Sequence, residues 1–214
     1  MGVRVPNHPI ALALLKAFVQ SGGKGVAAPS ANRFGNVSPT TAQAVSDELG
    51  HYLTASDLIL DGGACDVGVE STIIDCTGIM PKILRPGAIT AQMIQETTGL
   101  KVIGFVEKSA IRVSGSLESH YAPAAKVWLS ETPIVGQGFI AQADIPTPEG
   151  VIRLASPGTN EEFARILYAA LRAADAQGLA EIVVTQPIGA GIAIAIRDRL
   201  KRAANHETRR QSRL

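Results

Sequence analysis

Segments typical of β-strands alternate with segments typical of helices along residues 126–204 of this 214-residue chain. Parallel neighbouring strands must be joined by a crossover, usually a helix, so this alternation favours a layered α/β arrangement. We therefore expect a small parallel sheet with helices in this half of the chain. The patterns predict strands at residues 126–129, 151–154 and 181–185 and helices at residues 161–176 and 192–204. Residues 131–150 are loop-like in composition and receive no element.

The first half of the chain carries shorter signals of the same two kinds. Helices are expected at residues 10–20, 39–49 and 91–98, the first of them largely buried because it is apolar on most sides. Ser38 is predicted to be the N-cap of the second helix, because Pro39 fits the first helical position. Short strands are expected at residues 2–6, 25–28, 58–61, 69–75 and 82–84.

A proline followed by small hydroxyl and amide side chains marks the stretch Ala28-Pro29-Ser30-Ala31-Asn32. The free N–H groups at the start of the next helix and the small neighbouring residues suit a phosphate or a carboxylate. This composition indicates a binding loop. The alternative is an ordinary capped helix after a loop, which the local pattern alone does not exclude.

Polar residues also interrupt the apolar segments that follow. Ser71 and Thr72 within a predicted strand are either hydrogen-bonded inside the sheet or in contact with a ligand. The glycine-rich residues 62–68 allow a close approach of backbone to a ligand. Arg85 stands at a strand end before a Pro-Gly turn, and its guanidinium matches the geometry of phosphate or carboxylate. We expect an anion to bind near Arg85.

Residues 111–123 are rich in turn-forming residues and lack periodicity, which predicts a linker. His120 and Tyr121 stand out within it. His120 is either a surface histidine or a functional residue, and Tyr121 either packs against one domain as an anchor or contacts a ligand.

Gly189-Ala190-Gly191 lies where a strand passes into a helix, as in dinucleotide-binding folds. The third glycine of that fingerprint is missing and no acidic ribose ligand is identifiable. Close packing is therefore a better explanation than an oxidoreductase site.

Composition narrows the classes of protein. With 46% hydrophobic and 18% charged residues the chain is globular, and no apolar run is long enough for a membrane span. Met1 is followed by no charged-then-apolar leader, so we expect a cytoplasmic location. Cys65 and Cys76 are too few for a disulfide framework or a four-cysteine metal site, and are expected to be small buried hydrophobes.

The formal net charge of +1 argues against a general polyanion binder, although basic residues crowd the end of the chain. These residues are Arg197, Arg199, Lys201, Arg202, Arg209, Arg210 and Arg213. We expect them to form a solvated terminus, with RNA contact as the alternative.

Six motifs, taken in order, resemble the YrdC-like threonylcarbamoyl-AMP synthases in their longer, two-domain form. They are Arg4-Val5-Pro6 with His8-Pro9, Ala28-Pro29-Ser30-Ala31-Asn32, Ser38-Pro39-Thr40, Gly68-Val69-Glu70-Ser71-Thr72, Leu84-Arg85-Pro86-Gly87 and Glu118-Ser119-His120-Tyr121-Ala122-Pro123. The resemblance implies an α/β fold: a partial YrdC-like twisted open sheet with helices, then a linker, then a small Rossmann-like parallel α/β domain. The implied boundaries are residues 1–109, 110–125 and 126–214.

The resemblance also implies a nucleotidyltransferase activity. The family makes threonylcarbamoyl-AMP and pyrophosphate from L-threonine, bicarbonate and ATP, for the tRNA-modification machinery that modifies an adenosine beside the anticodon. Mg²⁺ is expected on the triphosphate, held largely by phosphate oxygens and water. Weak double-stranded RNA binding is a further expectation. The implied L-threonine contacts are Arg4, Ala28 and Ser71, and the implied ATP contacts are Ser30, Asn32, Ser38, Arg85 and Tyr121.

Positioning and charge neutralisation account for such an adenylation, so no covalent catalytic residue is expected. The linker with Tyr121 is expected to fold over bound ATP as a lid.

The chain also departs from the family. Members normally carry about a hundred residues before the segment that ends at Arg4, a part of domain size that holds a wall of the threonine pocket and a Lys-x-Arg pair for the triphosphate. We therefore expect a catalytic domain with an exposed core unless another chain completes it. Two interpretations remain. The first is the enzyme, or the C-terminal piece of it, as part of tRNA modification. The second is a noncatalytic nucleotide- or RNA-binding remnant that retains Ser30, Ser38 and Arg85 but has lost turnover. The second domain departs at residues 131–150, where the family usually has a helix.

Overall fold

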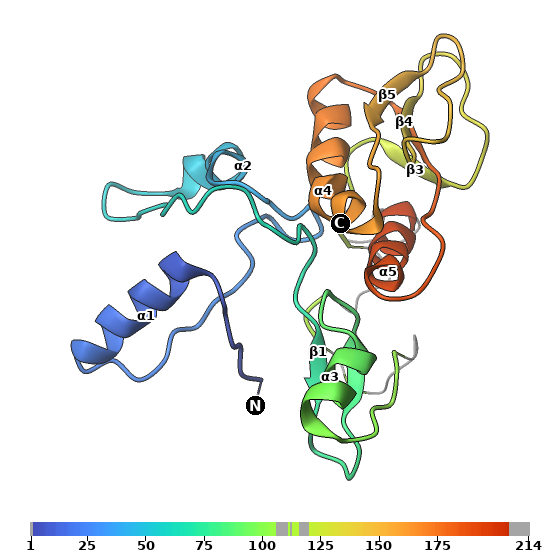
Figure 1. The fold of residues 1–214 in the computed structure, drawn as a ribbon. Coiled ribbons are helices and arrows are strands. Elements are labelled where there is room, and N and C mark those ends of the chain that lie inside the picture. The colour runs from blue at the N-terminus through green and yellow to red at the C-terminus, as the bar shows by residue number, and fades with distance from the viewer. Residues whose placement is uncertain (1, 106–110, 112, 116–119, 206–214) are drawn as a thin grey trace.

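The computed structural model describes residues 2–105, 111, 113–115 and 120–205. Its C-terminal half contains a parallel four-stranded sheet in the order β3–β6–β4–β5 (Figure 1). The strands are β3 (Lys126–Leu129), β4 (Gly138–Ile140), β5 (Ile152–Ala155) and β6 (Glu181–Val184), and the helices with them are α4 (Asn160–Ala176) and α5 (Ile192–Ala204). The predicted α/β fold with a small parallel sheet is confirmed.

Strand β4 lies inside the segment expected to be a loop, so that expectation was wrong. β4 pairs in parallel with both β5 and β6 and is therefore interior to the sheet. Phe139 and Ile140 are only 2% and 0% exposed and belong to different apolar clusters, one on each face. A three-residue strand between turn residues gives too short an apolar run to detect from periodicity.

The main core lies where α4 and α5 pack together against one face of this sheet. Phe163, Leu167 and Leu171 recur at helical spacing on α4 and meet Ile196 and Leu200 of α5, and all five side chains are almost fully buried. Burying side chains of this size stabilises a fold by about 1.5–3 kcal/mol each. From the first half of the chain, Val37 and Val69 pack against this core.

A two-stranded antiparallel ribbon precedes the linker. Its strands are β1 (Ile73–Asp75) and β2 (Lys82–Arg85), and α3 (Ala91–Thr98) follows. The Thr90 hydroxyl caps α3 by accepting the Met93 N–H at 3.2 Å, and Gly99 ends the helix with a left-handed φ of 71°. The sequence predicted both ends of α3 correctly, because threonine and glycine have these positional preferences.

The strands expected at residues 2–6, 25–28 and 58–61 do not form in the described part of the chain, and the one expected at residues 69–75 is reduced to β1. These predictions were wrong. A strand is defined by hydrogen bonds to a neighbour, and the apolar pattern carries no information on whether a neighbour is present. The large apolar side chains of residues 2–6, 25–28 and 58–61 are exposed, with Val5 at 90%.

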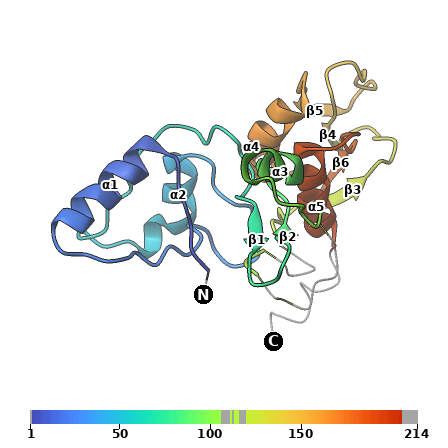
Figure 2. The same ribbon diagram turned by 60° about the horizontal axis from the view of Figure 1, so that its bottom comes forward.

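Helix α1 (Pro9–Gln20) has the predicted position but not the predicted burial. None of its residues is buried, and Leu12, Leu14 and Phe18 are among the exposed large hydrophobic side chains. In Figures 1 and 2, α1 lies away from the C-terminal sheet. An apolar helix face becomes buried only where a second element covers it, and the described residues place none over α1.

Helix α2 (Ala42–Leu49) begins later than predicted and is followed by the short helix η1 (Gly50–Tyr52). Thr41 is its N-cap, because the Thr41 hydroxyl accepts the Ala44 N–H at 3.1 Å. The prediction of Ser38 as the cap was therefore wrong. Ser38 instead points its hydroxyl to Glu70.

Both cysteines are exposed, so the expectation that they are buried was also wrong. Cys65 follows the uncovered residues 58–61, and Cys76 lies just beyond β1. Of the residues that the structure describes, none belongs to a helix with the length and apolar character needed to cross a membrane.

Candidate functional site

The carboxylate of Glu70 is the meeting point of the two halves of the chain. It accepts hydrogen bonds from the Ser38 hydroxyl at 2.7 Å, the Tyr168 hydroxyl at 2.9 Å and 3.1 Å, and Nε of Arg199 at 2.8 Å. Burial favours the neutral acid, but the charge of Arg199 and the hydrogen bonds outweigh it and lower the pKa of Glu70. Glu70 is thus a charged acceptor fixed by α4 and α5.

Tyr168 is the neutral donor in this group. Its side chain is fully buried, and burial together with the nearby Glu70 charge raises the pKa of Tyr168 well above its ordinary value. The hydroxyl therefore keeps its proton and donates a hydrogen bond to the carboxylate. A hydrogen bond from a neutral donor to a buried anion is among the stronger kinds in proteins.

Arg199 contacts two segments of the first half at once. It donates from Nη2 to the Pro86 carbonyl at 2.9 Å, while Nη1 pairs with Asp198 at 2.6 Å. Asp198 in turn accepts from Arg202 at 2.9 Å. The expectation of a solvated basic terminus was therefore wrong for Arg199, which is 0% exposed. Arg209, Arg210 and Arg213 lie outside the described residues.

Arg85, the predicted anion ligand, is buried and already satisfied. Its Nε and Nη2 donate to the Ser71 carbonyl at 3.0 Å and 2.9 Å, and Nη2 also reaches the Ser71 hydroxyl at 3.3 Å. Nη1 donates to the Ser114 carbonyl at 2.9 Å. Burial lowers the pKa of Arg85. The guanidinium is therefore held mainly by neutral oxygens, one of them from the linker.

Tyr121 of the linker packs into the same place. Its ring is 1% exposed, lies 5.7 Å from the Tyr168 ring in a stacked orientation, and has the Arg199 guanidinium 5.5 Å from its centroid. Tyr121 has a φ of 61°, a value that packing must impose on a residue other than glycine. A Cβ added to Gly115 would lie 2.0 Å from the Tyr121 hydroxyl and 3.4 Å from Nη1 of Arg85. Tyr121 and Arg85 therefore share one small space.

His120 is half-buried beside Tyr121, with the two ring centroids 4.1 Å apart. Burial lowers the pKa of His120, which favours the neutral imidazole. Its Nδ1 is buried without a hydrogen-bond partner among the described residues. Two alternatives were given for each of these residues. Tyr121 packs as an anchor, against α4, and His120 is not a surface histidine.

Seven of the eight predicted contact residues divide into two groups, and Asn32 belongs to neither. Ser71, Arg85 and Tyr121 lie together, and Ser38 joins them through Glu70. Arg4, Ala28 and Ser30 are exposed, and no hydrogen bond within the described chain connects them to this group.

Asn32 is buried and shapes its own loop, with its amide nitrogen donating to the carbonyls of Arg33 at 2.9 Å and Asn36 at 3.2 Å. Its Oδ1 accepts no hydrogen bond in the described structure. Asn32 therefore keeps one free acceptor beside the segment that leads to Ser38.

A second polar contact fastens this loop to α4. Glu48 of α2 accepts from the Asn36 amide at 2.6 Å and from Arg172 at 3.1 Å, and Arg172 also donates to the Val37 carbonyl. Burial opposes ionisation, yet these hydrogen bonds lower the pKa of Glu48. The segment around Ser38 is thus held on both sides by charged pairs.

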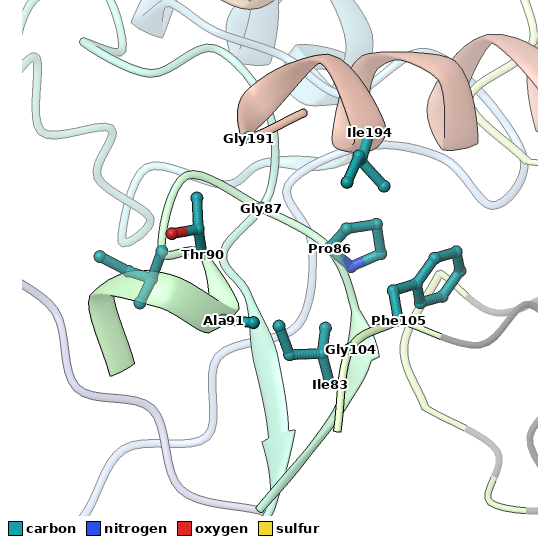
Figure 3. Close-up of a pocket in the computed structure, with 10 residues that line it drawn as sticks. Ile83, Pro86, Gly87, Thr90, Ala91, Gly104, Phe105, Gly191 and Ile194 are labelled. Atoms are coloured by element: carbon teal, nitrogen blue, oxygen red, sulfur yellow. The ribbon is translucent and has the colours of Figure 1, made fainter. Parts of the chain in front are cut away.

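A small cavity of about 100 Å³ lies between β2, α3 and the start of α5, and Figure 3 shows Ile83, Pro86, Phe105 and Ile194 around it. Its lining is largely apolar, and Thr90 contributes a hydroxyl group to it. Because it includes none of the eight predicted residues and offers no cation, it is a poor match for a phosphate.

The described residues contain no group of three or more His, Cys, Asp or Glu side chains that could hold a metal ion. The Glu70 carboxylate is already engaged by three donors.

Comparison with known proteins agrees with this arrangement. Residues 89–205 match the family model described as "Threonylcarbamoyl-AMP synthase, C-terminal domain". The chain belongs to this family. Residues 1–87 match a second model, described as "Telomere recombination". The resemblance seen in the sequence motifs is confirmed at the level of the family.

Threonylcarbamoyl-AMP synthases from three organisms align along nearly the whole chain. The Bacillus subtilis protein is 31% identical over 95% of this chain and 63% of its own length, and the Pyrococcus abyssi protein is 31% identical over 96% and 64%. The Schizosaccharomyces pombe protein is 33% identical over 95% and 57%. The chain thus spans about three fifths of the length of these relatives.

A solved structure shows the same fold. The crystal structure of P. abyssi Sua5 complexed with L-threonine has a TM-score of 0.77 and 31% identity, covering 94% of this chain and 63% of that one. A variant of the same protein, with an adjacent histidine and tyrosine both changed to alanine, gives the same TM-score at 30% identity.

Sequence reasoning missed three members of the polar group: Glu70, Tyr168 and Arg199. Glu70 lies within a motif that was noted, but no role was assigned to it. Arg199 falls three residues after Ile196 and seven after Ile192, on the apolar side of its helix. A charged residue on the apolar side of a helix indicates that a partner of opposite charge is buried beside it, and this was the available signal for Arg199.

The lowered pKa of Glu70 predicts how stability depends on pH. Because the unfolded glutamate binds protons near its ordinary pKa of 4.5 and the folded one does so only at lower pH, stabilisation from Glu70 is fully present above that range. We expect the free energy of unfolding to fall as the pH drops through about 4.5 toward the folded pKa. Urea unfolding followed by circular dichroism between about pH 3 and about pH 7 measures this.

Glu70→Gln should flatten that part of the pH profile, since its amide does not titrate. Glu149→Gln, at an exposed glutamate, is the matched control and should leave the profile unchanged. The same acid dependence in the Glu70→Gln variant and the unaltered chain would contradict the role given to Glu70.

Proposed function

We propose that this chain carries the ATP-handling part of a threonylcarbamoyl-AMP synthase. The reaction joins L-threonine, bicarbonate and ATP into threonylcarbamoyl-AMP and releases pyrophosphate, and its product serves tRNA modification. Membership of the family supports the proposal, as does one observation in the structure: Ser71, Arg85 and Tyr121 gather at one point, with Ser38 linked to them through Glu70.

Attack on the α-phosphorus requires that charge on the phosphates be neutralised and the reacting atoms be aligned. Arg85 is the cation suited to this task, and Ser30, Asn32 and Ser38 are the proposed polar contacts of ATP. The Oδ1 of Asn32 is a buried acceptor without a partner in the described structure, and a nucleotide amino group could reach it only after its loop opens. Mg²⁺ would neutralise further phosphate charge, bound by phosphate oxygens and water.

The linker must move for Arg85 to reach a phosphate. Nη1 is taken by the Ser114 carbonyl, and Tyr121 is buried against Tyr168. Release of Ser114 would free Nη1, and the Tyr121 ring could then close over the nucleotide. The proposal of Tyr121 as a lid therefore requires at least two positions of the linker.

Ser71 lies beside Arg85, so a threonine bound there would be next to the phosphate end of ATP. Arg4 and Ala28 are the further proposed contacts of threonine, and Arg4 would bind the carboxylate of the threonine. Both are exposed on segments without a covering element. We propose that a further polypeptide segment completes this side of the site, as the longer relatives suggest.

The alternative proposal is a noncatalytic remnant that binds nucleotide or, weakly, RNA. The separation of Arg4, Ala28 and Ser30 from the polar group favours it. We propose a cytoplasmic location for either form, where ATP and tRNA are present.

Pyrophosphate release separates the two proposals. The purified chain is incubated with ATP, Mg²⁺, L-threonine and bicarbonate, alone and with the segment that precedes the matching region in the B. subtilis relative. The enzyme proposal predicts threonine-dependent release with the added segment. Arg85→Ala should reduce that release by about 10²-fold or more, as expected for loss of one group that stabilises developing charge.

Arg165→Ala, at an exposed arginine of α4, is the matched control and should keep the full rate. No release in either mixture from folded protein, with ATP binding retained in calorimetry, would favour the remnant instead.

A further inference from the structure

We propose that Tyr168 and Arg199, both from the C-terminal half, are positioning residues of the ATP and threonine site. They act through Glu70 and Pro86 on Ser38, Ser71 and Arg85. The inference rests on the proposed function and extends it, because it makes α4 and α5 part of the site's machinery.

The first step is the geometry at Glu70. Tyr168 donates to both carboxylate oxygens and Arg199 to Oε2, so the carboxylate plane is fixed from the side of α4 and α5. Oε1 then has a lone pair left to accept the hydrogen bond from the Ser38 hydroxyl, at 2.7 Å. The orientation of Ser38 is therefore set by residues that lie 98 and 129 positions from Glu70 in the sequence.

The second step is the backbone on both sides of Ser71 and Arg85. Nη2 of Arg199 lies 2.9 Å from the Pro86 carbonyl and 3.4 Å from the Glu70 carbonyl. One side chain thus spans the residue before Ser71 and the residue after Arg85. A Cβ added to Gly87 would lie 2.5 Å from the Thr72 nitrogen, so the two segments touch through their backbones where Arg199 holds them.

The third step is the linker. The Tyr121 ring stacks on Tyr168 and lies beneath the Arg199 guanidinium, so the two residues that fix Glu70 also fix the resting place of Tyr121. The position of the linker and the orientation of Ser38 therefore both depend on Tyr168 and Arg199.

A polar group of this kind is not needed for stability alone. Buried ion pairs are often no more stabilising than well-packed apolar side chains of similar volume. The particular effect of Tyr168 and Arg199 is to orient their partners. Hydrogen bonds are directional, so they fix the orientation of the segments at Ser38, Ser71 and Arg85, which apolar contacts alone would not do.

Tyr168→Phe tests this with little change in packing, since the ring stays stacked and only the donor to Glu70 is lost. The dissociation constant of Mg·ATP, measured by calorimetry on the full chain, should rise about tenfold, the effect of one hydrogen bond to a charged group. Tyr52→Phe, at an exposed tyrosine, is the matched control and should bind ATP as the unaltered chain does.

A double-mutant cycle distinguishes positioning from a general loss of stability. Ser38→Ala and Tyr168→Phe both act through Glu70, so their effects on ATP affinity should be strongly non-additive. Additive effects, or a lower melting temperature with unchanged affinity in Tyr168→Phe, would overturn the inference and leave the proposed function standing. If the unaltered chain binds no ATP either alone or with the added B. subtilis segment, the proposed function fails and the inference fails with it.

Discussion

Replacing Arg199 with methionine should lower the free energy of unfolding by about 3–5 kcal/mol, the cost of removing one partner from a buried ion pair. Methionine fills much of the same volume, so the loss reports mainly on charge and hydrogen bonds. Glu70 would keep only its bonds from Ser38 and Tyr168, and the Pro86 carbonyl would lose its donor. Urea unfolding followed by circular dichroism and by the fluorescence of Trp128, the single tryptophan, measures the change.

Arg165→Met is the control for this substitution, because Arg165 is exposed on the neighbouring helix. It should change the free energy of unfolding by about 0.5 kcal/mol or less. Equal effects of the two substitutions would mean that the Arg199 network adds nothing beyond the apolar core of α4 and α5.

The C-terminal half was predictable because its elements are long or carry strong local signals. Helices α4 and α5 each show an apolar stripe over three or more turns, and Thr159 caps α4 by accepting the Glu162 N–H. Strand β4 was missed although it is interior to the sheet, since three residues do not make a period. Its place depends on β5 and β6, which lie later in the sequence.

The first half of the chain shows the opposite balance. Residues 2–6, 25–28 and 58–61 have the composition of strands, yet the described structure gives them no partner. Composition reports a residue's preference for a pleated surface, whereas a strand forms only when a second strand arrives. The same reasoning explains why α1 matches its predicted bounds to within one residue and has none of the predicted burial.

The site was predictable where chemistry is local and not where it depends on long-range contacts. Arg85 at a strand end and Ser71 in a polar interruption were both singled out, and the structure joins them. Tyr168 and Arg199 have no local signature of a ligand site. They matter because the fold carries them 98 and 129 residues back to Glu70.

Gly68→Ala should weaken the attachment of the first half of the chain to α4. A Cβ at residue 68 would lie 2.3 Å from the Ala164 carbonyl oxygen and 2.4 Å from the Arg165 Cα, and helix backbone cannot give way. Gly68 also has a φ of 81°, which a side chain disfavours. We expect residues 68–72 to exchange amide hydrogens faster, while α4 stays protected by its own core.

Gly63→Ala separates the two causes of this effect. Gly63 has a φ of 82°, but a Cβ there would meet nothing within 4 Å. Gly63→Ala should lower the free energy of unfolding only by the cost of placing a side chain in the left-handed region, about 1–2 kcal/mol. Gly68→Ala should cost about 1–3 kcal/mol more, as for overpacking of a filled contact. Because the additional cost arises where Gly68 meets α4, it should appear together with weaker ATP binding, since Glu70 then leaves Tyr168. Equal costs at the two glycines would mean that α4 does not hold this segment in solution.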